Sequence, residues 1–320
     1  MKQVFVTGAS GFLGAYIVRA LVARGYGVRA LARSAKAIDV VRALGAEPVK
    51  GDLSEGSSLR QALQRCDAVI HSAALFALWG PLADFEAVNV EGTRHLLAEA
   101  AAAGIKSFVQ IGASGVVMGE AKDMVRITEA NTSLAYPGWA PYLTTKARSE
   151  AVVLQANRSS MRTSVIRPPL IWGAGMPMLD EFAVGAEQFR WPNGGGHLMS
   201  TSHAANVAEA AVLAMERAPG GKSYFVADGQ DRSLKDILTA LLATRGVRLG
   251  NASMSLGVAG AMARAMEFVW STFRLRGQPP LTRQLLRMIG YTFTLDDTLA
   301  RSELGYRPVV TWEKGLTAMA

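Results

Sequence analysis

The stretch Val4-Phe5-Val6-Thr7-Gly8-Ala9-Ser10-Gly11-Phe12-Leu13-Gly14 combines an apolar strand, a glycine turn and the start of a helix. Gly8 permits a sharp exit from the strand, Gly11 lets the backbone approach a ligand closely, and Gly14 lets the helix pack on the strand. Free N–H groups at the start of the helix attract an anion. This order predicts a site for a dinucleotide diphosphate. The residues expected to form it are Thr7, Gly8, Ser10, Gly11, Phe12, Leu13 and Gly14.

A glycine triplet is also typical of a plain turn before a buried helix, so the wider pattern decides between the two interpretations. Strand-like runs alternate with segments of helical periodicity through the first half of the chain. This alternation predicts an α/β fold, a doubly wound parallel Rossmann sheet with its ligands at the carboxyl ends of the strands. The runs are residues 3–7, 28–32, 47–49, 68–71, 108–111 and 164–167.

The regular alternation weakens after Arg167-Pro168-Pro169, where residues 170–196 are rich in Gly, Pro, Met and Trp. A helical pattern at 204–216 and a strand-like run at 222–227 follow. We therefore predict a dinucleotide-binding domain at residues 1–169, rejoined by about residues 203–228. The rest of 170–320 is expected to form a smaller, discontinuous C-terminal substrate domain.

The composition excludes several classes of protein. The 320 residues are 50% hydrophobic and can bury a large core, and Cys66 is the only cysteine, which fits a reducing compartment. Because the first strand starts almost at Met1, we expect no signal peptide and a cytoplasmic protein. The formal charge is +8, but the basic residues are scattered along the chain rather than clustered, so no nucleic-acid partner is expected. The four histidines lack metal-ligand spacing, so no metal site is expected.

Pro141-Tyr142-Leu143-Thr144-Thr145-Lys146 places a phenol and an amine four residues apart, on one face of an expected helix. A nearby ammonium favours the phenolate and lowers the pKa of the tyrosine toward a value useful for proton transfer. Ser114 follows the strand at 108–111, beyond the carboxyl end of the sheet, where it can bind a carbonyl oxygen. Without the glycine loop, an exposed helix pair would be the better interpretation.

The glycine loop, Ser114, Tyr142 and Lys146 together resemble the extended short-chain dehydrogenase/reductases, which include the NAD-dependent epimerases and dehydratases. The resemblance runs nearly from end to end. Residues 200–210 are similar to the 3β-hydroxysteroid dehydrogenase and dihydroflavonol reductase branch. One departure is Gly112-Ala113, where the family commonly has a serine beside the position of Ser114. Further matches are Gly51-Asp52-Leu53, His71-Ser72-Ala73-Ala74, Asn89-Val90-Glu91-Gly92-Thr93, Arg167-Pro168-Pro169 and Leu304-Gly305-Tyr306-Arg307-Pro308.

The resemblance implies hydride transfer between nicotinamide C4 and a substrate carbon. Tyr142 would be the general acid or base, Ser114 would hydrogen-bond the substrate oxygen, and Lys146 would hold the nicotinamide ribose. Asp52 would lie near the adenine. The other residues implied to contact the cofactor are Leu53, Ala73, Ala74 and Pro169, with Tyr142 and Lys146 themselves.

The second strand ends without the acidic residue that commonly binds both ribose hydroxyls of NAD. Arg33 follows it instead, with Lys36 nearby, and a guanidinium there can face a 2′-phosphate. This predicts NADP(H) in preference to NAD(H), which stays the alternative. A solvated arginine at the end of a strand is the simpler explanation.

The expected substrate is small and hydrophobic: a sterol, polyketide, β-keto acyl or flavonoid-like compound whose ketone and secondary alcohol are interconverted. Two alternatives stay open, an epimerase or dehydratase that retains its nicotinamide and a non-catalytic nucleotide-sensing protein. The apolar residues expected to line the pocket are Phe76, Leu78, Trp79, Met118, Trp139, Trp172, Met176, Met178, Leu179 and Phe182.

Two further surfaces are suggested by the helical patterns. The alanine-rich helices expected at 84–103 and 141–157 suit a homodimer interface. Residues 256–276 mix apolar residues with Arg264, Arg274 and Arg276. That pattern is typical of a lid over the substrate, which we favour, or of a peripheral membrane contact, and it is too charged to span a bilayer.

Overall fold

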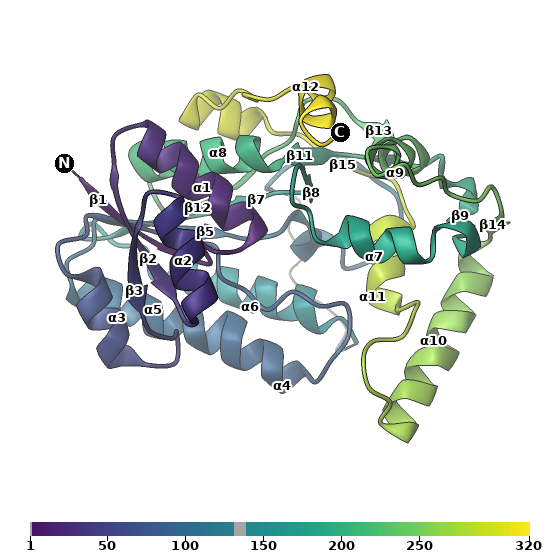
Figure 1. Ribbon diagram of the computed structural model, residues 1–320, viewed down its shortest axis with the longest axis horizontal. Coiled ribbons are helices and arrows are strands. Elements are labelled where there is room, and N and C mark those ends of the chain that lie inside the picture. The colour runs from purple at the N-terminus through teal and green to yellow at the C-terminus, as the bar shows by residue number, and fades with distance from the viewer. Residues whose placement is uncertain (1, 131–138) are drawn as a thin grey trace.

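A computed structural model describes residues 2–130 and 139–320. Within these residues a seven-stranded parallel sheet has the order β12-β7-β5-β4-β1-β2-β3 (Figure 1). The predicted α/β fold with a doubly wound parallel sheet is confirmed. The last strand, β12, comes from the segment expected to rejoin the first domain. The strands are β1 (Gln3–Thr7), β2 (Gly27–Ala32), β3 (Glu47–Lys50), β4 (Ala68–His71), β5 (Ser107–Ile111), β7 (Arg162–Arg167) and β12 (Lys222–Phe225).

Helices cover both faces of this sheet (Figure 1). On the first face lie α1 (Phe12–Ala23), α2 (Ala35–Ala43) and α8 (Ala204–Arg217). On the second face lie α3 (Gly56–Leu63), α5 (Gly92–Ala102) and α6 (Pro141–Gln155). Both faces of the strands are therefore buried, which explains their nearly continuous apolar runs.

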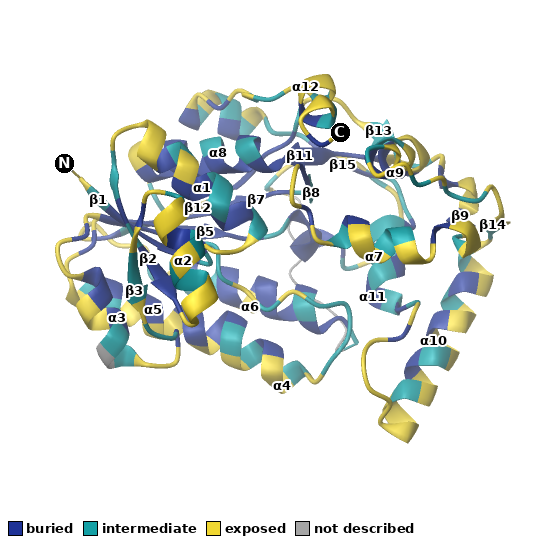
Figure 2. Ribbon diagram, in the orientation of Figure 1, coloured by how far each residue is buried: buried dark blue, intermediate teal, exposed yellow. Residues whose placement is uncertain are grey.

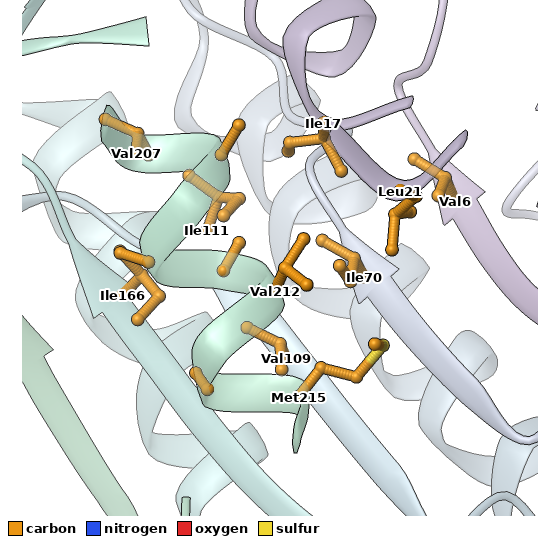
Figure 3. Close-up of a cluster of buried hydrophobic side chains, with 14 of the residues drawn as sticks. Val6, Ile17, Leu21, Ile70, Val109, Ile111, Ile166, Val207, Val212 and Met215 are labelled. Carbon is orange, nitrogen blue, oxygen red and sulfur yellow. The ribbon is translucent and has the colours of Figure 1, made fainter. Parts of the chain in front are cut away.

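The first face is sealed by α8, whose many alanines let it lie close to the strands and to α1. Ala208, Ala210 and Ala211 are fully buried. Figure 3 shows larger side chains from α1 and α8 gathered over the strands. Burying each such Ile, Leu or Val contributes about 1.5–3 kcal/mol. The labelled side chains are Val6, Ile17, Leu21, Ile70, Val109, Ile111, Ile166, Val207, Val212 and Met215.

The remaining elements of the described chain surround three small sheets. The largest joins β13 (Arg232–Ser233), β10 (Leu198–Met199), β15 (Phe293–Leu295) and β6 (Met124–Ile127) in that order. Two pairs complete the set, β8 (Leu170–Trp172) with β11 (Thr201–His203), and β9 (Trp191–Pro192) with β14 (Ser253–Met254). The helices are α7 (Met178–Val184), α9 (Leu234–Ala243), α10 (Leu256–Phe273), α11 (Arg283–Ile289) and α12 (Trp312–Thr317).

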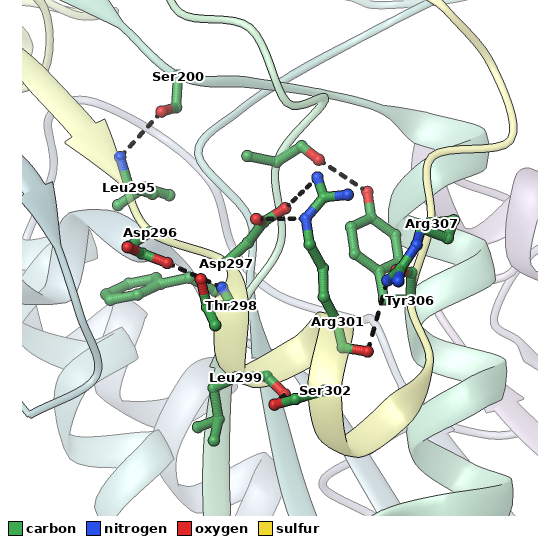
Figure 4. A network of polar contacts seen from close by, with 12 residues as sticks. Ser200, Leu295, Asp296, Asp297, Thr298, Leu299, Arg301, Ser302, Tyr306 and Arg307 are labelled. Carbon is green, nitrogen blue, oxygen red and sulfur yellow. Dashed lines mark hydrogen bonds and ion pairs between the residues drawn. The ribbon is translucent and has the colours of Figure 1, made fainter.

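The segment after β15 is fixed by the polar network of Figure 4. The Arg301 guanidinium donates to both carboxylate oxygens of Asp297, at 2.7 and 2.8 Å. The Tyr306 hydroxyl donates to the carbonyl of Ala227, just beyond β12, at 3.0 Å. Gly305 lies between them with φ +70°, a conformation that favours glycine. The Leu304-Gly305-Tyr306-Arg307-Pro308 motif therefore attaches the C-terminal segment to the central sheet.

The single helix expected at 84–103 is instead three consecutive segments: α4 (Leu82–Phe85), a π-helical turn at Glu86–Glu91, and α5. The π-turn carries Asn89, whose amide bonds both backbone groups of Leu75 and the Thr145 hydroxyl of α6. These bonds, of 2.7–3.1 Å, fasten the loop after β4 to α6. A π-turn often marks a functional site, because it turns one side chain away from the helical pattern.

A buried chain of hydrogen bonds joins the carboxyl ends of β1 and β4 to α6. The Thr7 hydroxyl lies 2.7 Å from His71 Nδ1, and His71 Nε2 lies 2.9 Å from the Thr93 hydroxyl. Thr93 donates to the carbonyl of Asn89 at 2.7 Å, so it must accept from His71. His71 therefore carries a proton on Nε2. Thr93 also contacts Ser149 of α6 at 3.0 Å, which extends the chain to that helix.

Lowering the pH should reduce the stability of the folded protein through the protonation of His71. Burial, helped by the charge of Lys146, lowers the pKa of His71 from 6.5 to about 3. Between pH 6.5 and about pH 3, His71 binds a proton more readily in the unfolded chain than in the folded one. The free energy of unfolding should therefore fall by about 1.4 kcal/mol for each unit by which the pH is lowered. Urea unfolding from pH 7 to pH 4 should give a shallower pH slope for His71→Gln than for wild type. His95→Gln, on the exposed side of α5, is the control, and equal slopes for all three proteins would contradict the assignment.

Candidate active site

The glycine loop is packed so tightly that side chains do not fit. Gly8 has φ +72°, and a Cβ there would lie 2.7 Å from the backbone nitrogen of Ala73. A Cβ on Gly14 would lie 2.0 Å from the carbonyl oxygen of Gly8. No side chain caps the first turn of α1, so its N–H groups are free for an anion. The loop has the form of a cradle for a diphosphate.

This loop lies where the strand order reverses, between β1 and its neighbour β4. Ligands of doubly wound sheets bind at that crevice. Thr7 ends β1 and accepts a hydrogen bond of 3.2 Å from Ala73 N, so the two strand ends are joined there. Ala73 is half-buried and Ala74 is exposed in the same loop, Ser10 is exposed, Phe12 is half-buried, and Leu13 is buried. The structure thus brings the predicted glycine-loop and Ala73–Ala74 residues together.

A second group of predicted residues lies at the ends of β2 and β3. Arg33 is 77% exposed and pairs with Asp52 at 3.4 Å. The Ser54 N–H bond is the main cause that lowers the pKa of Asp52, with Arg33 adding to it. Lys36 is exposed in the first turn of α2. The Leu53 side chain is buried in the core, so any contact of this residue with a nucleotide falls to its backbone.

The three predicted catalytic residues gather at the carboxyl end of β5. The buried Lys146 ammonium donates to the carbonyl of Ile111, the last residue of β5, at 2.6 Å. Ser114 begins a 3₁₀ turn three residues later, and its N–H donates to Pro168 O beyond β7 at 2.9 Å. A Cβ on the next residue, Gly115, would lie 2.8 Å from Leu143, so this turn is packed on α6 beside Tyr142. Pro169 follows Pro168 at the same edge.

The electrostatics of Tyr142 differ from expectation. Burial raises the pKa of its phenol, and its ring packs edge-on against Phe76 with 4.9 Å between ring centroids. The predicted lowering by Lys146 is not found, and burial is the cause of the shift. Burial also lowers the pKa of Lys146 itself, to about 8, and the charge of Glu150 opposes that effect.

Glu150, one helical turn beyond Lys146, forms a buried ion pair with Arg167. Arg167 Nε donates to both of its carboxylate oxygens at 3.0 Å, and the guanidinium also lies over the Phe225 ring. A buried carboxylate without such a partner would be costly. This ion pair accounts for the arginine of the Arg167-Pro168-Pro169 motif. Its carboxylate, on Glu150, acts electrostatically on Lys146.

Sequence reasoning missed Gln284, a fully buried residue of α11. Its side-chain oxygen accepts from the Tyr142 N–H at 3.1 Å, and its nitrogen donates to the Ala77 carbonyl at 3.2 Å. It therefore joins α11, the first turn of α6 and the loop after β4. No motif surrounds Gln284, and only the three-dimensional packing brings it to the tyrosine.

Some predicted pocket residues lie elsewhere. Trp172, Met176 and Leu179 are buried in a core cluster with α9, so the expectation that they line the substrate pocket is wrong. The Trp172 indole donates to Asp228 at 2.7 Å and packs against Trp312, which holds it inside. Near Tyr142, Phe76 is 46% exposed, Leu78, Trp79 and Trp139 are half-buried, and Met118 is buried.

One surface hollow of about 420 Å³ is lined by Arg60, Gln64, Arg65, Ala102 and Ala103, away from the strand ends that hold the candidate residues. Across residues 2–130 and 139–320, no cluster of three or more His, Cys, Asp or Glu could bind a metal ion. In the same ranges, no helix combines the length and apolar character needed to cross a bilayer.

Comparison with known proteins shows which family the chain belongs to. Residues 5–256 match the sequence model of the 3-beta hydroxysteroid dehydrogenase/isomerase family. The chain is 39% identical over 321 residues to a 4-hydroxy-2-methyl-3-oxo-4-farnesyl-3,4-dihydroquinoline-1-oxide ketoreductase of Stigmatella aurantiaca, covering 99% of this chain and 95% of that protein. It is 33% identical to a 2-alkyl-3-oxoalkanoate reductase of Stenotrophomonas maltophilia, covering 98% and 97%.

A sterol-4-alpha-carboxylate 3-dehydrogenase of Dictyostelium discoideum is 32% identical over 99% of both chains. The solved dTDP-glucose 4,6-dehydratase DesIV of Streptomyces venezuelae, with NAD bound, has a TM-score of 0.76 at 21% identity, covering 99% of this chain and 95% of that one. The chain therefore shares the fold of that structure. The chain belongs to the 3-beta hydroxysteroid dehydrogenase/isomerase family, as the sequence resemblance predicts, and is an oxidoreductase of that family.

Proposed function

We propose that this protein uses NADP(H) to reduce the ketone of a hydrophobic substrate. The observation that carries the proposal is the buried Lys146 ammonium at the end of β5, one turn from Tyr142 and beside Ser114. Nicotinamide, when bound in the crevice of the glycine loop, supplies the hydride. The chain's own residues then handle the substrate oxygen and its proton.

Tyr142 is suited to act as the acid. Because burial raises its pKa, the phenol stays protonated at neutral pH and can donate its proton to the oxygen that gains charge as hydride reaches the carbonyl carbon. The Ser114 hydroxyl would donate a second hydrogen bond to that oxygen. Lys146 would hold the nicotinamide ribose, and the buried pair of Glu150 and Arg167 would hold the ammonium in position.

The substrate class is supported by two relatives, one named as a reductase of a farnesylated 3-oxo-dihydroquinoline-1-oxide and one as a reductase of 2-alkyl-3-oxoalkanoates. The half-buried aromatic and aliphatic side chains of the loop after β4 offer a matching surface beside Tyr142. A β-keto acyl compound is the first substrate to test. An epimerase or dehydratase with retained nicotinamide and a nucleotide-sensing protein stay the alternatives, and the homodimer and the cytoplasmic location stay predictions.

Tyr142→Phe separates these functions. The variant keeps the ring that packs on Phe76 but has no proton to donate, so we expect turnover to fall by about 10²–10⁴-fold while NADPH binding is unchanged. The assay follows NADPH absorbance with a long-chain 2-alkyl-3-oxoalkanoate, and NADPH fluorescence gives the dissociation constant. Tyr26→Phe, which removes the hydroxyl of a tyrosine at the amino end of β2, away from the site, is the control. Wild-type turnover without net NADPH consumption would favour the epimerase or dehydratase, and unchanged turnover in Tyr142→Phe would refute the acid assignment.

NADP(H) preference is supported by the positive end of α2. Ser34 caps this helix by accepting from Ala37 N, and Arg33 and Lys36 flank the cap. A 2′-phosphate there would meet a helix N-terminus and two cations. The Arg33 guanidinium contacts Asp52 across the end of the sheet and is otherwise open to solvent, so it can turn toward such a phosphate.

Arg33→Ser should therefore raise the KM for NADPH about tenfold or more, because a charge-assisted bond to the phosphate is lost, and leave the KM for NADH nearly unchanged. Steady-state kinetics with both cofactors measures this split. Arg42→Ser, farther along α2, is the matched control. A wild-type preference for NADH would show that Arg33 is only a solvated surface residue.

Gln284 is proposed to position Tyr142. Gln284→Met removes both of its hydrogen bonds at similar side-chain length and leaves buried backbone groups unpaired. We expect kcat for the ketone to fall about tenfold with unchanged NADPH affinity, because the first turn of α6 loses its support. The exposed Gln278→Met is the control. A parallel loss of activity and NADPH affinity would indicate general destabilisation rather than positioning.

A further inference from the structure

Helix α10 is apolar on two opposite sides. One side packs on α11, where Ala259 and Ala263 are buried with Leu286. The other side faces solvent along its length, and Figure 2 shows the exposed positions on this helix, which stands apart from the central sheet in Figure 1. The exposed fractions are Val258 54%, Met262 37%, Phe268 68%, Val269 37% and Phe273 68%. A patch of this kind is typical of an interaction surface.

The charges around this side are all positive. Arg264, Arg274 and Arg276 are exposed, and Leu275 between the last two is 44% exposed. Glu267 is the only acidic residue in 256–276, and it is 3% exposed. Its carboxylate accepts from the Arg283 backbone at 2.7 Å and pairs with the Arg283 guanidinium. The exposed side therefore presents phenyl and aliphatic groups beside guanidinium groups, without an accessible carboxylate.

This combination matches an anionic lipid surface. Apolar side chains enter the boundary between headgroups and acyl chains, while arginines bind the lipid phosphates. A two-fold contact between copies of α10 would instead bring their arginines together without any carboxylate to pair them. A lid over the substrate accounts for the buried side of α10 and leaves the exposed side unexplained.

We propose that α10 and residues 274–276 dock the protein on bilayers that contain anionic phospholipid, with the helix lying along the surface. Arg264 near its middle keeps the helix at the interface, since a guanidinium is costly in the hydrocarbon core. The proposal does not depend on the catalytic assignment, because binding to vesicles is measured without turnover.

Flotation with vesicles tests this docking. Wild type should float with phosphatidylcholine vesicles that contain phosphatidylglycerol, and not with phosphatidylcholine alone. The double variant F268S/F273S should bind at least about tenfold more weakly for each phenyl removed. R274Q/R276Q should weaken binding about fivefold for each charge and reduce its salt dependence. Val309→Ser, which replaces a side chain that is 55% exposed away from α10, is the control.

Thermal unfolding of each variant should match wild type, because the altered side chains are exposed. The proposal would be overturned if wild type did not float with the anionic vesicles, or if F268S/F273S bound them as tightly as wild type. Sedimentation tests for self-association. If wild type sediments as a dimer, F268S/F273S sediments as a monomer and wild type does not float with the vesicles, this surface binds a second copy of the chain.

Discussion

The hydrogen bond from the buried Lys146 ammonium to the carbonyl of Ile111 is the contact on which the account of the site depends. It joins α6 to the carboxyl end of β5 and thereby fixes the position of Tyr142, one turn earlier on the same helix. Burying an ammonium is expensive, and it is tolerated here because a carbonyl and the Glu150 carboxylate balance it. The same burial keeps the phenol protonated, which fits ketone reduction better than alcohol oxidation at neutral pH.

Around this contact, buried polar groups hold the strand ends in register. His71 joins Thr7 at the glycine loop to Thr93, and Thr93 reaches Ser149 on α6. These bonds link the ends of β1 and β4 to α6 through directed contacts. The glycine loop and the helix that carries the proposed acid are therefore joined by one chain of buried polar contacts.

Local patterns predicted much of this molecule. The glycine loop and the strand runs are short-range signals, and the spacing of Tyr142 and Lys146 lies within one helix. The predictions that were wrong, and the residues that were missed, depend on packing between segments that are distant in the sequence. The direction of the Tyr142 pKa shift follows burial by neighbouring elements, Trp172 is held in the core by Asp228, and Gln284 reaches Tyr142 from 142 residues away. The π-turn that carries Asn89 has no simple periodic signal. Tertiary contacts of this kind do not appear in residue spacing.

The most direct test of the central claim uses reduced nicotinamide dinucleotide phosphate labelled with deuterium at the transferable C4 position and a long-chain 2-alkyl-3-oxoalkanoate. Mass spectrometry should find one deuterium on the new carbinol carbon of the product made by wild type. A Tyr142 variant that lacks the hydroxyl should form almost none of this product. A carbinol formed without deuterium, or no carbinol from any hydrophobic ketone tested while the cofactor binds normally, would contradict the proposed reduction.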